Sequence, residues 1–280
     1  MNKEYRVLNH GFVRLVDVMG DDAAIVQAAR TSYGAGTKTV SEDRDLIRYL
    51  MRNNHTSPFE MVEFKFHIKL PIFVARQWIR HRTANVNEYS GRYSEMRDEF
   101  YVPSPSDVKK QSINNKQGRS EEELSSDITD KFIEELTSSQ TAQFNEYKKN
   151  LDDGIARELA RIKLPLSVYT EWYWKIDLHN LLHFLKLRLD EHAQYEIRVY
   201  ANIISDIVKS ITPLAYEAFE DYRLESVVFS KKEKIAMAKI LSKIDYSELN
   251  LTTEELLSFG LGKREASEFN SKIKNILNTY

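Results

Sequence analysis

The sequence predicts an α+β domain, in which a sheet carries helices, followed by a helical C-terminal appendage. Two observations indicate this class: segments with strand periodicity are interspersed with segments with helix periodicity, and the composition becomes rich in Lys, Glu and Ser beyond residue 223. We expect one domain over 1–223 and the helical extension over 224–280. The chain has 280 residues, of which 42% are hydrophobic, enough for one globular domain or two small ones with a substantial core.

The N-terminal part begins with a strand and two amphipathic helices. FVRLVDVMG, residues 12–20, is typical of a strand, and helices are expected over about 22–32 and 42–53. MVEFKFHIKL, residues 61–70, places Phe, Ile and Leu at even positions and charged or polar residues at odd ones, which predicts a half-buried strand. Pro71 then suits the first position of a helix, which IFVARQWIR continues.

The middle of the chain is polar. Residues 104–127 almost lack large apolar side chains, so we interpret them as a solvated loop, with a lid over a site as the alternative. A helix with a polar face is expected over about 128–150. Another begins near Gly154, in GIARELARI.

The last part of the predicted domain is a strand followed by a long helix. LSVYTEWYWKI, residues 166–176, alternates enough for a strand, and residues 177–211 have helical periodicity with a break expected near Asp190. In the C-terminal extension, KKEKIAMAKILSKI (231–244) and EASEFNSKIKNIL (265–277) predict short surface helices.

Composition excludes several classes of function. The formal net charge of −2 gives no general basic field for nucleic acid or an anionic membrane, and no apolar run approaches the roughly 20 residues that span a bilayer. The first residues, MNKEYRVLNHG, lack the apolar region of a signal peptide, so we expect a cytoplasmic protein. The absence of cysteine excludes disulfides, thiolate metal sites and a Cys nucleophile.

One short polar segment, WIRHRTANVNEYSGRYSEM over 78–96, nevertheless concentrates positive charge. Ser90, Arg92 and Tyr93 offer a hydroxyl, a guanidinium and an aromatic face within four residues, which suits a phosphate, a ribose and a planar ring. Glu88 could neutralise an arginine or accept a hydrogen bond from a bound base or sugar. The segment therefore indicates a nucleotide site of undefined identity; a solvated basic surface and a nucleic-acid-binding module are the alternatives.

A second group of candidates lies on the predicted long helix. His179 and His183 are one turn apart on one face, as in the metal pair of a hydrolase, but an HExxH glutamate and a third ligand of diagnostic spacing are missing. Structural or ligand-facing histidines are therefore favoured. Arg188 follows His183 by five residues, roughly 140° around a straight helix. We expect the arginine and the histidines to serve two surfaces, which suits a site built between subunits.

The remaining candidates have simpler explanations. The aromatic residues around EWYWK, together with Trp78, could stack on a ring system, but aromatic residues on a strand more often belong to the core. His55, in NNHTSPFE, is expected on a turn that contains proline, where a lone histidine is usually just exposed. Arg157 and Arg161, one helical turn apart, are expected to be surface charges.

The segment RHRTANVNEYSGRY resembles the RHRxxSxNExSxRY signature of the flavin-dependent thymidylate synthases. HTSPFEMVEFKFHIKLPIFVARQWIRHR before it and LRLDEHAQYEIRVYA after it also resemble this family, so the resemblance covers about residues 10–223 apart from 104–127. It implies an antiparallel-rich sheet packed with long helices, and a homotetramer whose sites combine several chains. The implied reaction is reductive methylation of dUMP to dTMP, with FAD as cofactor and with NADPH and 5,10-methylenetetrahydrofolate as cosubstrates.

The resemblance also implies roles for individual residues. Arg188 stands at the position of the arginine that activates the uracil, and is the expected catalytic residue. The residues expected at dUMP, with Arg161 supplied by another subunit, are Gln77, Arg80, Glu88, Tyr89, Ser90, Gly91, Arg92, Arg161 and Arg188. Those expected at FAD are Ser57, Arg80, His81, Arg82, Asp177, His179 and His183. His55 matches a histidine on the folate and nicotinamide side, and no metal is expected.

The chain departs from the family pattern at four positions. Asn85 replaces the signature Ser but keeps a polar side chain. Asp177, His179 and His183 stand where the family often has Asn, Arg and Asn, so a permanent cation is lost there. Because no cysteine can activate the pyrimidine, we expect the fixed charge of Arg188 to stabilise negative charge developing on the ring.

Overall fold

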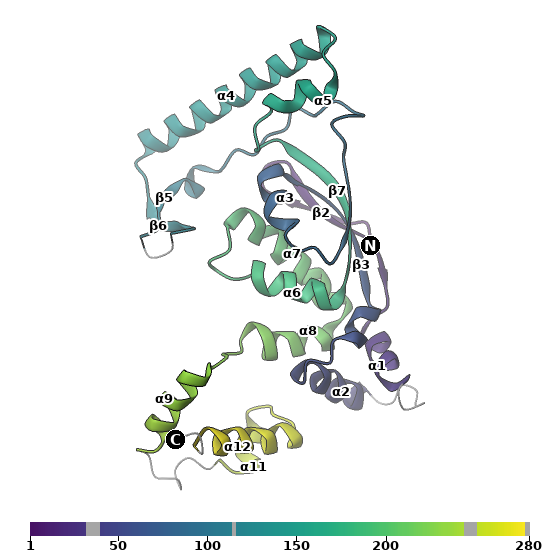
Figure 1. Cartoon of the computed structure of the whole chain (residues 1–280), viewed down its shortest axis with the longest axis vertical. Coiled ribbons are helices and arrows are strands. Elements are labelled where there is room, and N and C mark those ends of the chain that lie inside the picture. The colour runs from purple at the N-terminus through teal and green to yellow at the C-terminus, as the bar shows by residue number, and fades with distance from the viewer. Residues whose placement is uncertain (32–39, 114–115, 244–250, 278–280) are drawn as a thin grey trace. The chain divides into compact units, whose positions relative to one another are not determined.

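The computed structural model of the chain describes residues 1–31, 40–113, 116–243 and 251–277 (Figure 1). It divides into two units, residues 1–224 and 225–280. The first unit contains a five-stranded antiparallel sheet with helices packed on it, which confirms the α+β class. In the described part of the chain, no helix has the length and apolar character needed to cross a membrane.

The sheet has the strand order β1-β2-β3-β7-β4, and every neighbouring pair is antiparallel. Its strands are β1 (Glu4–Val7), β2 (Gly11–Met19), β3 (Glu63–Pro71), β7 (Tyr169–Asp177) and β4 (Asn85–Glu88). Three of these strands confirm the predictions over 12–20, 61–70 and 166–176. The sequence did not predict β1 and β4, which are four-residue strands with little apolar alternation.

The alternation of apolar and polar residues in β3 produces the half-buried strand that the sequence predicted. Phe64, Phe66, Ile68 and Leu70 are completely buried, whereas most of the polar residues between them keep some solvent contact. Pro71 has extended backbone angles (φ −65°, ψ 146°), ends β3 and caps α3 (Ile72–Trp78). The expectation that Pro71 is the first helical residue is therefore wrong by one position, because its backbone still belongs to the strand.

Helices α3, α6 and α7 pack against the strands, as Figure 1 shows. The predicted break is confirmed: α6 (Leu178–Arg188) is separated from α7 (Tyr195–Ile211) by a turn in which Asp190 Oδ1 accepts the backbone N–H of His192 at 2.8 Å. A second helical group, which includes the two helices predicted near the N-terminus, consists of α1 (Asp22–Thr31), α2 (Val40–Arg52), η1 (Ser57–Met61), α8 (Pro213–Phe219) and η4 (Glu220–Leu224). The expected last residue of the first helix, residue 32, lies outside the described residues.

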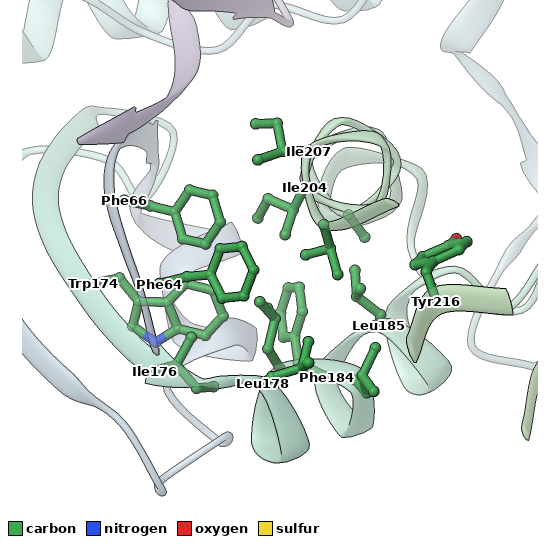
Figure 2. Close-up of a cluster of buried hydrophobic side chains, with 14 of the residues drawn as sticks. Phe64, Phe66, Trp174, Ile176, Leu178, Phe184, Leu185, Ile204, Ile207 and Tyr216 are labelled. Carbon is green, nitrogen blue, oxygen red and sulfur yellow. The ribbon is translucent and has the colours of Figure 1, made fainter. Parts of the chain in front are cut away.

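The main core lies between the sheet and the helices packed on it, α3, α6 and α7, and its centre is aromatic (Figure 2). Phe66 stacks on Trp174 at 6.0 Å between ring centroids, and Trp174 packs on Phe184 of α6 at 5.2 Å. Trp78, at the end of α3, contacts Phe184 at 4.6 Å. These rings fix the end of α3 against α6, which is where the candidate site begins.

The segment 104–127 is solvent-accessible as expected, because none of its described residues is buried, but it is not a plain loop. It contains η2 (Pro105–Asp107) and a hairpin of β5 (Lys109–Gln111) and β6 (Arg119–Glu123). The strands are linked by ion pairs, Lys109 to Glu121 at 2.8 Å and Lys110 to Glu122 at 2.9 Å, so no apolar period reveals them. Residues 114–115 lie outside the described residues.

The two helices predicted after this hairpin are present. The first is α4 (Ser126–Asp152), and the second is the short α5 (Arg157–Ala160), which continues as η3 (Arg161–Lys163). Tyr147 of α4 is buried, and its hydroxyl accepts the backbone N–H of Met96 at 2.9 Å. The helix therefore supports the polar loop that the sequence singled out.

The C-terminal unit is helical, as predicted. It contains α9 (Lys231–Leu241), α11 (Thr253–Ser258) and α12 (Lys263–Leu277). Capping boxes begin α9, at Ser230 and Glu233, and α11, at Thr252 and Glu255. Residue 244, the expected end of the first of these helices, lies outside the described residues.

Phe184→Ala tests the aromatic core. Phe184 is completely buried, so its truncation is expected to lower the free energy of unfolding by about 3–5 kcal/mol. Leu187→Ala on the same helix is the control, because Leu187 is 47% exposed and its loss is expected to cost about 0.5 kcal/mol or less. Urea unfolding at equilibrium measures both variants; equal losses would contradict this account of the core.

Candidate active site

The RHR segment follows directly on the end of α3. Arg80 and Arg82 are exposed, and neither forms an ion pair with a carboxylate in the described part of the chain. His81 is partly buried, and its ring packs edge-on against Phe184 at 4.9 Å and lies 6.1 Å from the ring of His183. The aromatic core thus orients His81, while the arginines on either side of it keep uncompensated charge.

Arg188, the last residue of α6, is held against this segment. Its Nε donates to His81 Nε2 at 3.1 Å, and its Nη2 donates to the carbonyl oxygen of Gln77 at 3.4 Å. The side chain of Gln77 donates in turn to Gln194 in the turn after α6. Arg188 makes no ion pair with a described carboxylate, so its charge is positioned by two neutral acceptors.

The charge states of His81 and Arg188 agree with the hydrogen bond between them. Burial, then the neighbouring charges of Arg188 and His183, lower the pKa of His81 to about 4. His81 is therefore neutral near pH 7 and can accept at Nε2, which places its own proton on Nδ1. Burial also lowers the pKa of the Arg188 guanidinium, which marks this cation as partly desolvated and able to interact strongly with an anion.

The second half of the signature folds as β4 and a tight turn. Thr170 Oγ1 donates to Glu88 Oε1 at 2.8 Å, and the backbone N–H of Tyr89 donates to the Glu171 carbonyl at 2.8 Å. These bonds tie the segment to β7. The polar residues of this turn are thus displayed from a fixed strand and not from a free loop.

Two side chains approach Gly91 closely in the turn. A Cβ at this position would lie 2.9 Å from Met96 Sδ and 3.2 Å from Arg161 Cδ. Arg161 of the same chain therefore packs on the turn, and Arg92 forms an ion pair with Glu158 at 3.1 Å, between Nε and Oε2. The two cations and the Ser90 hydroxyl, which accepts the backbone N–H of Arg92 at 3.3 Å, form one cluster.

His183, whose ring lies near that of His81, also lines a pocket of about 250 Å³, which we call the histidine pocket. It contains His55, His179 and His183, all of which the sequence singled out. Its full lining consists of Leu50, Met51, Asn54, His55, Thr56, Phe59, His179, Leu182, His183, Lys186, Phe219 and Arg223. No aspartate or glutamate occurs among these lining residues, so the permanent charges of the lining are the positive ones of Lys186 and Arg223.

Two further predicted residues flank this pocket. Asp177 caps α6, because its Oδ1 accepts the backbone N–H of Asn180 at 3.0 Å and its Oδ2 accepts the Asn180 side chain at 2.8 Å. Ser57 is exposed at the start of η1, next to the pocket-lining Thr56. The predicted residues therefore form two groups. One is the Arg80–Arg92 segment with Gln77, Arg161 and Arg188 against it, and the other is the histidine pocket with Asp177 and Ser57 near its lining residues in the sequence. The rings of His81 and His183, 6.1 Å apart, lie where the two groups meet.

The structure also bears on the other interpretations. Trp78, Trp172 and Trp174 are buried in the core. On β7 the ring of Tyr173 is 44% exposed and is therefore accessible to a ligand. In the ranges that the structure describes, no group of three His, Asp or Glu side chains is placed to hold a metal ion. The expectation that Arg188 and the histidines serve two surfaces agrees with the pocket, whose lining includes His179 and His183 but not Arg188.

Comparisons with known proteins identify the family. The profile of the thymidylate synthase complementing protein family matches residues 14–214. The chain belongs to this family. The resemblance to flavin-dependent thymidylate synthases is thus confirmed, and two proteins of that name are similar over nearly their whole length. The one from Wolbachia pipientis wMel is 57% identical over 96% of this chain and 92% of its own, and the one from Treponema denticola 54% identical over 98% of both.

A solved structure supports the same assignment. The UMP/dUMP methylase PolB from Streptomyces cacaoi, bound with 5-Br dUMP, is 34% identical and has a TM-score of 0.71, over 80% of this chain and 100% of its own. The fold is therefore the family fold. The alignment with the Treponema denticola protein extends into the C-terminal unit, which the family profile does not reach.

Sequence reasoning missed the two permanently charged residues of the histidine pocket, Lys186 and Arg223. Lys186 is three residues after His183, so the helical period that joined the histidines also places it on their face. Arg223 is 37 residues further along the chain, and no local pattern connects it to α6. Glu158, the ion-pair partner of Arg92, is 66 residues away from it in the sequence, so no local pattern connects the two.

The low pKa of His81 predicts a pH dependence of stability. The unfolded ring has an ordinary pKa near 6.5, so between pH 6.5 and about 4 the unfolded chain binds a proton that the folded chain does not. This contribution to stability is complete above pH 6.5 and is lost as the pH falls towards 4. Allowing for partial solvent contact, we expect a loss of about 1–2 kcal/mol.

Urea unfolding of the wild type and of His81→Gln at pH 7.5 and pH 5 measures this effect. Glutamine cannot titrate, and its amide oxygen can still accept from Arg188. The wild type is expected to lose more stability than the variant on acidification, and identical pH dependence would show that His81 titrates normally.

Proposed function

We propose that the chain catalyses the reductive methylation of dUMP to dTMP, with FAD as cofactor, 5,10-methylenetetrahydrofolate as carbon donor and NADPH as reductant. The relatives named flavin-dependent thymidylate synthase and the dUMP-related ligand of the PolB structure support this assignment. The observation that carries it is the unpaired Arg188 guanidinium, held by His81 and Gln77 beside the signature segment.

Arg188 suits activation of a pyrimidine without a covalent adduct. The chain has no cysteine to add to the ring, so the electron-rich form of the uracil must be stabilised by charge. Arginine stays protonated at any working pH, so Arg188 acts as a fixed cation and not as a base. His81 supports it by accepting at Nε2, which directs the guanidinium without neutralising it.

The signature turn is the proposed dUMP site. Ser90 and Arg92 form, with Arg161, a cluster suited to a phosphate, in which dUMP would displace Glu158 from Arg92. In this structure the Arg161 at the turn belongs to the same chain, and in the proposed homotetramer we assign this place to Arg161 of another subunit. The ring would lie towards Gln77 and Arg188. Arg80, Glu88, Tyr89 and Gly91 complete the set that we assign to dUMP.

The residues present fit FAD. The chemistry of the donors is suitable, because the histidine pocket has basic and apolar lining residues without a carboxylate, and Arg80 and Arg82 carry no ion pair among the described residues. Bound FAD would supply the hydride that completes the methyl group. The residues that we propose hold it are Ser57, Arg80, His81, Arg82, Asp177, His179 and His183.

The other cosubstrates are assigned to the same region. We propose that His55, on the rim of the histidine pocket, faces folate and the nicotinamide of NADPH. A homotetramer with shared sites is also part of the proposal. It is supported by exposed apolar side chains on the segment that carries Arg161, namely Ile155, Leu159, Ile162 and Leu166.

A direct assay tests the proposed function. The purified protein is expected to be yellow, its flavin should bleach with NADPH in the absence of oxygen, and dTMP should form only when dUMP and 5,10-methylenetetrahydrofolate are both present. A colourless protein that gains no flavin on addition of FAD and forms no dTMP would overturn the assignment. Zinc in stoichiometric amount would point instead to the histidine-metal alternative.

Arg188→Ala is expected to retain bound flavin and to lose nearly all dTMP formation, about 10³-fold or more, because the developing charge loses its fixed counterion. Flavin content by absorbance and dTMP by chromatography measure the two effects separately. Leu187→Ala, at the adjacent exposed position, is the control and should keep its activity. Undiminished turnover by Arg188→Ala would refute the role of Arg188.

Arg92→Ala is expected to raise the apparent KM for dUMP about tenfold with little change in kcat, because one charge-assisted contact to the phosphate is lost. Arg97→Ala is the matched control, since Arg97 is engaged by Glu171 on the sheet. Steady-state kinetics at several dUMP concentrations measure both. If Arg92→Ala altered only the NADPH dependence, the turn would not be the dUMP site.

A further inference from the structure

One face of α6 carries a row of basic residues towards the histidine pocket. His179, His183 and Lys186 are spaced by four and three residues, so they lie along one helical face, and all three line the pocket. Arg223, which belongs to η4 and not to α6, also lines the pocket. Lys186 and Arg223 carry the permanent positive charges of this set.

These two cations are not explained by structural ion pairs. Neither Lys186 nor Arg223 forms an ion pair with any carboxylate that the structure describes. Nearby arginines behave differently: Arg44 on α2 contacts Glu217 of α8 with its Nε at 3.0 Å from Oε2, and Arg48 contacts the same glutamate at 3.2 Å. The carboxylates of this region therefore neutralise the helix-packing arginines and leave the pocket cations uncompensated.

Arg223 is nevertheless held in place. Its Nη2 donates to the carbonyl oxygen of Met51 at 3.0 Å and also to the side-chain oxygen of Asn54. Both partners are neutral and come from the end of α2 and the residues just after it. The guanidinium is thus positioned at the pocket while its charge remains available, the same arrangement that His81 and Gln77 give Arg188.

The rest of the lining suits an organic ligand with an anionic end. Leu50, Met51, Phe59, Leu182 and Phe219 supply an apolar wall against which a ring or ribose can pack. The volume of about 250 Å³ is below the roughly 300–1,000 Å³ of pockets that enclose a whole ligand of drug size. The pocket therefore fits one nucleotide half of a dinucleotide better than an entire one.

We infer that Lys186 and Arg223 form an anion site that binds a phosphate of a dinucleotide whose adjoining nucleoside packs in the histidine pocket. This inference rests on the proposed function, which requires two dinucleotides, FAD and NADPH. It places two permanent cations, Lys186 and Arg223, at this phosphate, and both lie outside the Arg80–Tyr93 signature.

The experiment measures binding, not turnover. Full-length apoprotein is titrated with FAD by flavin fluorescence, for the wild type, Lys186→Gln, Arg223→Gln and the conservative Lys186→Arg. Each glutamine variant is expected to raise the FAD Kd about tenfold and to make the Kd less dependent on salt, whereas Lys186→Arg should retain affinity. Lys131→Gln is the matched control, because Lys131 is an exposed lysine on α4 outside the pocket.

A second arm identifies which dinucleotide occupies the site. If FAD affinity is unchanged but the NADPH concentration that half-saturates flavin bleaching rises about tenfold in both glutamine variants, the phosphate belongs to NADPH, and the anion site still stands. If neither quantity changes in folded variants, as judged by circular dichroism, the inference is overturned. A wild-type protein that forms no dTMP would instead show failure of the proposed function, whatever the variants do.

Discussion

The hydrogen bond from Arg188 Nε to His81 Nε2, 3.1 Å long, is the interaction on which the candidate active site depends. It joins residues 107 positions apart in the sequence, at the ends of α6 and α3. Since burial, and then the neighbouring charge of Arg188, keep His81 neutral, the ring accepts this bond and leaves the guanidinium with its full charge. A carboxylate in the same place would have fixed Arg188 equally well but would have neutralised it.

The sheet and its aromatic layer make this contact possible. The pairing of β3 with β7 places Trp174 beside Phe66, and Trp174 contacts both Phe184 of α6 and Trp78 at the end of α3. His81 follows Trp78 by three residues, and Arg188 follows Phe184 by four. Close packing of these large rings therefore fixes the distance between the two site residues, and a cavity here should disturb both stability and catalysis.

Local patterns in the sequence predicted most of the fold and part of the site. The alternation around Phe66 and the break at Asp190 depend on neighbouring residues, so periodicity and turn chemistry reveal them. The polar strands at Asn85–Glu88 and Lys109–Gln111 are held by long-range pairing and by ion pairs, and they have no apolar period to detect. The meeting of Lys186 with Arg223 likewise depends on tertiary packing.

The central claim is that a fixed cation stabilises negative charge on the pyrimidine ring. The most direct measurement is an ultraviolet titration of 5-fluoro-dUMP bound to the protein, which reports ionisation of the ring N3–H. The account predicts that the pKa of this group is lower in the complex than in free solution, and that Arg188→Ala removes the difference. A bound nucleotide whose N3–H ionises at the same pH as the free nucleotide, or at a higher one, would contradict the account.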